Sequence, residues 1–96
     1  MKYALYAQHV TLSDYQHRQV EEKIGRLSKL LKHPLPLEIA FTNDSPEVFR
    51  CHLSYGQGKD AFHAENTGPD IEDALDGAIE KLRRELVKQQ EKQRGR

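Results

Sequence analysis

One nine-residue segment, EVFRCHLSY at 47–55, restricts the possible folds more than any other part of the sequence. Its side chains alternate between apolar and polar, which indicates a β-strand with one buried face and one wet face. Turn-forming residues flank it, NDSP before and GQGKD after, and they predict antiparallel hairpins with the strands on either side. The chain therefore needs a sheet that is covered on one face only. The predicted inward residues are Phe49, Cys51, Leu53 and Tyr55, and the outward ones are Arg50, His52 and Ser54.

Three more segments have the length and the alternation of strands, namely residues 3–8, 37–42 and 61–66. The last of them, AFHAEN, turns His63 outward, where it is expected to lie beside His52. The inward residues expected from the three segments are Tyr3, Leu5, Ala7, Leu37, Ile39, Phe41, Phe62 and Ala64.

Two amphipathic helices separate and close these strands. Ser13 and Gln16 form a capping box, so the first helix begins there, and it is expected to run until the residue before Pro34. Asp70 caps the second helix after the TGPD break. Each helix carries a single apolar stripe. The stripe residues are Val20, Ile24, Leu27, Leu30 and Leu31 in the first helix and Ile71, Ala74, Leu75, Ala78, Ile79, Leu82 and Leu86 in the second.

The order β-α-β-β-β-α predicts an α/β protein of the α+β two-layer type, a four-stranded mixed sheet with both helices packed on one face. The 96 residues are expected to make a single domain, 1–96. The two strands joined by the first helix should run parallel if they pair. The predicted core consists of Leu5, Val20, Ile24, Leu27, Ile39, Phe41, Phe49, Leu53, Ile79 and Leu82.

Positive charge is concentrated at the C-terminal end of a chain that is neutral overall. Residues 81–96 hold seven Lys or Arg and two Glu, a net charge of +5, whereas residues 1–80 hold eight basic and thirteen acidic residues, a net charge of −5. Acids near a helix N-terminus and bases near its C-terminus complement the helix dipole, which accounts for part of this asymmetry. It does not account for four cations at helical spacing on one side of the second helix. These are Lys81, Arg84, Lys88 and Lys92.

These four residues form a basic ridge, and we expect the helix end from about residue 81 to residue 96 to project beyond the domain. The first helix repeats the pattern more weakly with Arg26 and Lys29, with Lys23 at the edge of its apolar stripe, although a Glu-Glu pair interrupts that face. Two basic ridges with a groove between them match the charge and spacing of a nucleic-acid backbone. The sequence therefore predicts phosphate binding by the helices.

No pattern typical of a catalytic or metal site is evident in the sequence. The five histidines lack ligand spacing, and exposed strand positions such as those of His52 and His63 accept histidine freely. The single cysteine, Cys51, excludes an internal disulfide and is expected to be a small core residue. No segment has the roughly 20 apolar residues that span a bilayer. We therefore expect a cytoplasmic, monomeric protein without enzymatic activity, cofactor, metal or membrane contact.

Several segments together follow the pattern of a known family. The second helix has Asp70, then Ala74-Leu75-Asp76, then Lys81-Leu82-x-Arg84-x-Leu86-x-Lys88. In the first helix, the matching positions are Val20, Lys23, Ile24, Arg26 and Leu27, and the segments HVTLSD at 9–14 and FHAE at 62–65 fit as well. On these positions the chain resembles the ribosome hibernation-promoting factor family, also called sigma-54 modulation proteins.

The resemblance implies the fold described above, and it implies a function. Members bind the small ribosomal subunit in the channel for messenger and transfer RNA, and they idle ribosomes in stationary phase or stress. The chain looks like a short form, and short forms act beside a separate ribosome modulation factor or block initiation alone. Contacts with ribosomal RNA would be made by Lys23, Arg26, Lys81, Arg84, Lys88 and Lys92, and Lys29 joins them on the basic face of the first helix.

Two other classes of binding protein share features with this chain. A double-stranded RNA-binding module has an α-β-β-β-α core, but such modules carry phosphate-binding lysines at the start of the last helix, where PDIEDALD is acidic. A sigma-factor or transcription modulator that acts through protein contacts would associate with its partner almost independently of salt. Charge position and salt dependence therefore distinguish the three functions.

Overall fold

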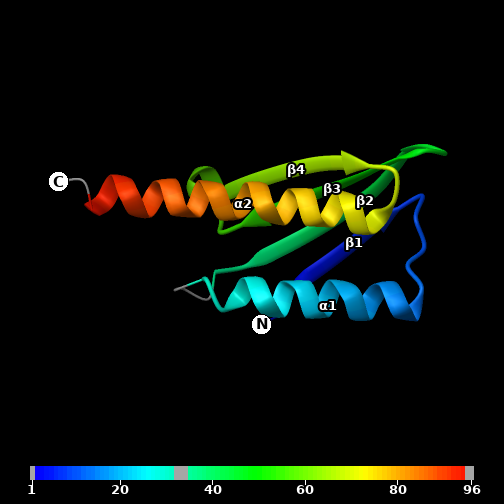
Figure 1. The fold of residues 1–96 in the computed structure, drawn as a ribbon, viewed down its shortest axis with the longest axis horizontal. Helices are drawn as coiled ribbons and strands as arrows, with labels where there is room; N and C mark the ends of the chain where they lie inside the picture. Colours follow the sequence, from blue (N-terminus) through cyan, green and yellow to red (C-terminus); the bar gives the residue numbers. More distant parts are fainter. Residues whose placement is uncertain (1, 32–34, 95–96) are drawn as a thin grey trace.

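Four strands and two long helices form the described part of the chain, which comprises residues 2–31 and 35–94 of a computed structural model, with side chains up to Gln89. The strands form one sheet in the order β1-β2-β3-β4, in which β1 runs parallel to β2 and the other neighbours are antiparallel. Both helices lie on the same face of this sheet (Figure 1). The predicted fold class is confirmed. The elements are β1 (Ala4–Gln8), α1 (Asp14–Ser28), β2 (Leu37–Ser45), β3 (Val48–Tyr55), the short 3-10 helix η1 (Gly58–Asp60), β4 (Phe62–Gly68) and α2 (Ile71–Arg94).

The register of β3 places its apolar side chains under the helices, as the alternation predicted. Cys51 and Leu53 are fully buried, and His52 lies between them on the open face of the sheet. The β2–β3 hairpin is tighter than predicted, because β2 continues to Ser45 with an irregularity after Asn43. The Asn43 side-chain amide donates to the main-chain oxygens of Ser45 and Val48, at 2.6 and 3.1 Å, and so ties the two strands together at the turn.

Helix α1 begins where the capping box predicted, but it ends earlier than expected. Ser13 Oγ accepts from Gln16 N at 3.1 Å, and Gln16 Oε1 accepts from Ser13 N at 2.9 Å. The helix ends at Ser28, and the next residues fold back through shorter-range bonds such as Leu30 N to Leu27 O at 2.9 Å. This tighter turn moves Leu30 off the apolar stripe on which it was predicted to lie, and its side chain is 49% exposed.

Helix α2 begins at the predicted cap and covers β3 and β4. Asp70 Oδ1 accepts from Asp73 N at 2.8 Å, which satisfies one of the free N–H groups of the first turn. The last turns of the helix reach past the ends of the neighbouring strands (Figure 1). Its buried residues are Ile71, Ala74, Leu75, Ala78 and Leu82.

The core agrees with most of the predicted positions and departs from them at its margins. Leu5, Phe49 and Ile79 pack against the core but are only partly buried. Ala7 is exposed, because β1 is an edge strand whose last three residues are all open to solvent. The predicted core residues that are buried are Val20, Ile24, Leu27, Ile39, Phe41, Leu53 and Leu82.

Glycines allow the close approach of α2 to β4, and the tightest of these contacts is at Gly77. A Cβ at Gly77 would overlap the side-chain amide of Asn66 on β4. The same Asn66 amide donates to the main-chain oxygen of Asp73 at 3.3 Å, so it also links the strand to the first turn of α2. Any side chain at position 77 must therefore displace Asn66 and break this link.

We predict that Gly77→Ala lowers the free energy of unfolding by about 1–3 kcal/mol, because overpacking at this contact outweighs the better helix propensity of alanine. Chemical denaturation of the purified variant measures this change. Gly25→Ala is the matched control, since a Cβ at Gly25 in α1 meets no atom within 4 Å, and it should stabilise the protein by up to about 1 kcal/mol. Equal stabilisation by both substitutions would show that the Gly77 contact is not close-packed.

Candidate nucleic-acid interface

The two helices lie side by side and run in the same direction (Figure 1). Side chains of both helices and of the turn after α1 line a groove between them. The groove has a volume of about 510 Å³ and an apolar floor. Three of the predicted phosphate-binding residues line it from α1. Its lining consists of Lys23, Arg26, Leu27, Lys29, Leu30, Asp76, Ile79, Glu80 and Arg83.

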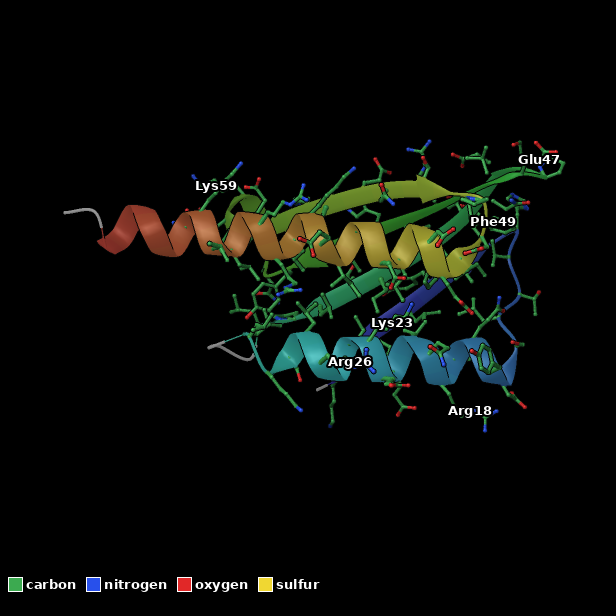
Figure 2. All side chains as sticks on the ribbon, in the orientation of Figure 1. Arg18, Lys23, Arg26, Glu47, Phe49 and Lys59 are labelled. Atoms are coloured by element: carbon green, nitrogen blue, oxygen red, sulfur yellow. The ribbon has the colours of Figure 1, made fainter. Side chains whose placement is uncertain are left out.

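Lys23 joins the two helices across this groove. Its Nζ lies 2.6 Å from Asp76 Oδ1, and its side chain is only 18% exposed. Figure 2 shows Lys23 on α1 beside Arg26, whereas Arg18 lies nearer the start of the same helix. An ammonium group that is already paired and mostly covered must break this pair before it can contact a phosphate. The geometry therefore indicates a structural role for Lys23.

Arg26 and Lys29 are more accessible than Lys23. The Arg26 side chain is 72% exposed and forms a bond of 2.6 Å with Glu22, one turn earlier in α1. Lys29 is exposed and forms no ion pair with any residue that the structure describes. An exposed pair of this kind contributes little to stability, because both ions are well solvated. Both cations are therefore available to an external anion at small cost.

The basic ridge predicted for α2 lies on the other side of that helix, next to the edge strand β4. Lys81, Arg84 and Lys88 line a second hollow there, with a volume of about 330 Å³, together with His63 and Glu65 of β4. The prediction of one groove between two basic ridges was therefore wrong. The apolar stripe of α2 sits between the two sides, so one side faces α1 and the other faces β4.

Lys81 has a local partner within this hollow. Its Nζ donates to the main-chain oxygen of Glu65 at 2.9 Å. Strand β4 pairs with β3 on one side only, so part of its main chain has no strand to pair with. Lys81 thus has a main-chain partner on this edge strand, which the sequence pattern did not reveal.

Arg84 and Lys88 remain largely free in the same hollow. Their side chains are 70% and 68% exposed, and their nearest carboxylates, on Glu80 and Glu85, lie 3.6 and 3.8 Å away. These distances exceed those of good charge-assisted hydrogen bonds. Glu80 and Arg84 thus form an i,i+4 pair that is present but loose. The side chain of Lys92 lies outside the described residues.

Arg83 is the groove residue that sequence reasoning missed. It lines the α1–α2 groove from α2 together with Asp76, Ile79 and Glu80. These positions repeat at three- and four-residue intervals, which places them on one face of a helix. The signal was present in the sequence, but the mixed charges of this face concealed it beside the purely basic ridge.

A separate charged cluster occupies the open face of the sheet. Arg50 lies between Asp44 and Glu65, at 2.6 and 3.1 Å, and these hydrogen bonds and charges raise the pKa of Arg50. His52 Nε2 lies 3.2 Å from His63 Nδ1, which confirms that the two histidines are neighbours. Because its opposite charges are paired with one another, this face offers less free positive charge than the helices do.

The remaining candidates for chemistry are unsuited to it. Burial raises the pKa of Cys51 to about 12, so its thiol stays protonated at neutral pH and cannot act as a nucleophile. Within the described residues, no group of three or more His, Cys, Asp and Glu side chains is placed to hold a metal ion. No helix in the described ranges has the length and apolar character needed to cross a membrane.

Comparison with known proteins gives a family and a set of similar folds. A family described as "Sigma 54 modulation protein / S30EA ribosomal protein" matches residues 3–94. The N-terminal domain of Thermus thermophilus Protein Y has a TM-score of 0.72 and 19% identity, covering 88% of this chain and 92% of its own. A ribosomal subunit interface protein from Coxiella burnetii has a TM-score of 0.77 and 17% identity, covering 94% of this chain and 98% of its own. No curated protein sequence matches significantly.

We predict that the Lys23–Asp76 pair couples the helices by about 1 kcal/mol, since one partner is largely buried. A double-mutant cycle with Lys23→Met and Asp76→Asn, followed by chemical denaturation, measures this coupling. The Glu22–Arg26 pair has the same 2.6 Å separation but both its side chains are more than half exposed, so its cycle should give only about 0.3–0.5 kcal/mol. A smaller coupling at Lys23–Asp76 than at Glu22–Arg26 would contradict the structural role.

Proposed function

Because the chain belongs to the family of sigma 54 modulation proteins and S30EA ribosomal proteins, we propose that it is a ribosome hibernation factor. It binds the small ribosomal subunit through ribosomal RNA and blocks the channel for messenger and transfer RNA. Translation is thereby inhibited in stationary phase or stress. The protein acts in the cytoplasm by occupying a site, and it needs no catalytic group, cofactor or metal for this purpose.

The observation that carries the proposal is the exposure of cations in the α1–α2 groove and in the hollow between α2 and β4. Arg26, Lys29, Arg84 and Lys88 are all exposed, and their intramolecular pairs are either absent among the described residues or solvated. Each of these cations can give up a weak interaction with a nearby carboxylate, where it has one, and bind a phosphate. Neutralising phosphates releases their counterions, and this release supplies affinity at ordinary salt concentrations.

The structure also supports different roles, structural or RNA-binding, for the residues predicted to bind RNA. Lys23 and Lys81 already have partners within the chain, at 2.6 and 2.9 Å. We therefore assign them mainly to holding the helices and the sheet edge in place. Phosphate contacts come from the exposed cations, with Lys92 as a further candidate from the end of α2.

Specificity for the ribosome comes from shape rather than from the phosphates. Phosphate contacts fix position and orientation but carry little sequence information. The domain is elongated, with extents of 47 × 23 × 22 Å. A rigid body of this size can fill a channel that must stay open for messenger and transfer RNA, so binding alone suffices to inhibit initiation.

We predict that Arg84→Glu combined with Lys88→Glu lowers the affinity for small subunits by at least about tenfold. Each substitution replaces an attraction between a cation and a phosphate with a repulsion between two negative charges. Co-sedimentation of the purified variant with small subunits measures this loss. The fold should be intact, because both side chains are exposed and only loosely paired.

A variant with the same change of charge elsewhere separates local contact from overall attraction. Lys2→Glu with Lys59→Glu alters two exposed cations outside both grooves; Figure 2 labels Lys59. Its affinity should fall much less. If both double variants bind equally well, or if the first still suppresses translation in a cell-free assay, the ridge on α2 is not the ribosome contact.

We predict that association with small subunits weakens steeply with salt, with a log–log slope of roughly −3 to −5 for about four to six phosphate contacts. Binding titrations between about 50 and 300 mM salt provide the slope. A slope near zero would favour the alternative of a transcription modulator that binds a protein partner. Arg84→Glu with Lys88→Glu should also reduce the magnitude of the slope.

A further inference from the structure

The groove between α1 and α2 has an apolar floor that phosphate binding does not require. Leu30 and Ile79 both line it; Leu30 is 49% exposed and Ile79 is partly buried. Leu30 occupies this place because α1 ends at Ser28 and the following turn folds back onto Leu27 O. Exposed aliphatic surface inside a charged groove indicates a ligand that has an apolar part.

The charges around the floor favour an anionic ligand. Four basic residues and two acidic residues line the groove, so the lining has a net charge of +2. One of the acids, Asp76, is paired with Lys23 at 2.6 Å. The cations that remain most accessible for an external anion are Arg26, Lys29 and Arg83.

We propose that this groove binds one unstacked nucleobase of a single-stranded or bulged RNA, with the base against Leu30 and Ile79 and the flanking phosphates on Arg26, Lys29 and Arg83. A nucleotide combines an apolar ring face with a phosphate close by, which matches a floor and rim of this kind. Proteins that read RNA hold splayed bases of loops and bulges on aromatic side chains or on Arg guanidinium planes; here Arg26 and Arg83 offer guanidinium planes beside the aliphatic surface of Leu30 and Ile79. The inference rests on the proposed function, in that RNA is the ligand.

Glu80 gives the groove a means of choosing among bases. Its carboxylate lies 3.7 Å from Arg83 and 3.6 Å from Arg84, so neither guanidinium holds it in a short hydrogen bond. A carboxylate accepts from the amino group of cytosine and is repelled by a carbonyl oxygen at the same ring position in uracil. The groove should therefore prefer cytosine to uracil, two bases of nearly equal size.

The test uses fluorescence anisotropy with labelled octamers of cytidine and uridine and with a duplex of the same length. Leu30→Ser should weaken octacytidine binding by about three- to tenfold and leave duplex binding unchanged. Val87→Ser is the matched control, since Val87 is 51% exposed on α2 and lies outside the groove. It should alter neither affinity. Thermal melting of both variants verifies that the fold is retained.

A second variant tests the preference between bases. We expect the unaltered protein to bind octacytidine about three- to tenfold more tightly than octauridine. Glu80→Gln replaces an acceptor with an amide that both donates and accepts, so this ratio of affinities should fall toward one. An unchanged ratio, or a preference for uridine in the unaltered protein, would overturn the assignment of Glu80. Equal effects of Leu30→Ser and Val87→Ser would overturn the base-binding groove itself.

Failure of this inference is distinguishable from failure of the proposed function. If small subunits bind in a salt-dependent way but Leu30→Ser has no effect on octamers or subunits, only the base-binding groove is wrong. If Leu30→Ser weakens subunit binding and leaves octamer binding unchanged, the groove holds a protein segment, which also refutes it. If the unaltered protein binds neither subunits nor RNA, the proposed function fails as well.

Discussion

The structure depends on the burial of a single sheet face under two helices. The inward side chains of β2 and β3, such as Ile39, Phe41 and Leu53, are almost completely removed from water. They achieve this only if α1 and α2 share the same side of the sheet, because the outward side chains are polar or charged. With their apolar stripes directed toward the sheet, the helices leave their charged residues at the sides of the stripes, so the cations of the first helix line the α1–α2 groove and the basic ridge of α2 lies beside β4. The position of the basic residues is therefore a consequence of core formation.

This constraint explains why so much of the fold was predictable. Alternation in a strand and stripes in a helix report burial directly, and the caps at Ser13 and Asp70 are local hydrogen bonds between residues three apart. The end of α1 was not predictable from Pro34. A serine hydroxyl that bonds to the carbonyl of Gly25, at 2.7 Å, and a tightened turn stop the helix at Ser28. Competition of this kind between side chain and backbone leaves no periodic signal.

The candidate site was predictable only in part, because its geometry arises from contacts between elements. Periodicity placed Lys81, Arg84 and Lys88 on one side of a helix, but it did not show that this side faces β4. Likewise, Lys23 looked like one cation among several until the structure placed Asp76 beside it. Partners that lie 53 residues apart in the chain have no pattern that a helical wheel can display. The sequence therefore predicts which cations are exposed, but only the structure shows which of them have no close partner within the described chain.

The hydrogen bond from Lys81 to the carbonyl of Glu65 places a charged side chain on the edge strand β4. An open strand edge is a template on which another chain can pair, and a lysine laid along it is an obstacle to such pairing. Lys81 therefore hinders pairing of another chain with this edge, in addition to adding positive charge to the surface. An arginine or a glutamate there would retain or reverse the charge without reproducing a compact ammonium on a main-chain oxygen. Loss of this lysine would thus favour self-association through the β4 edge, so a residue of the basic ridge also helps to prevent aggregation.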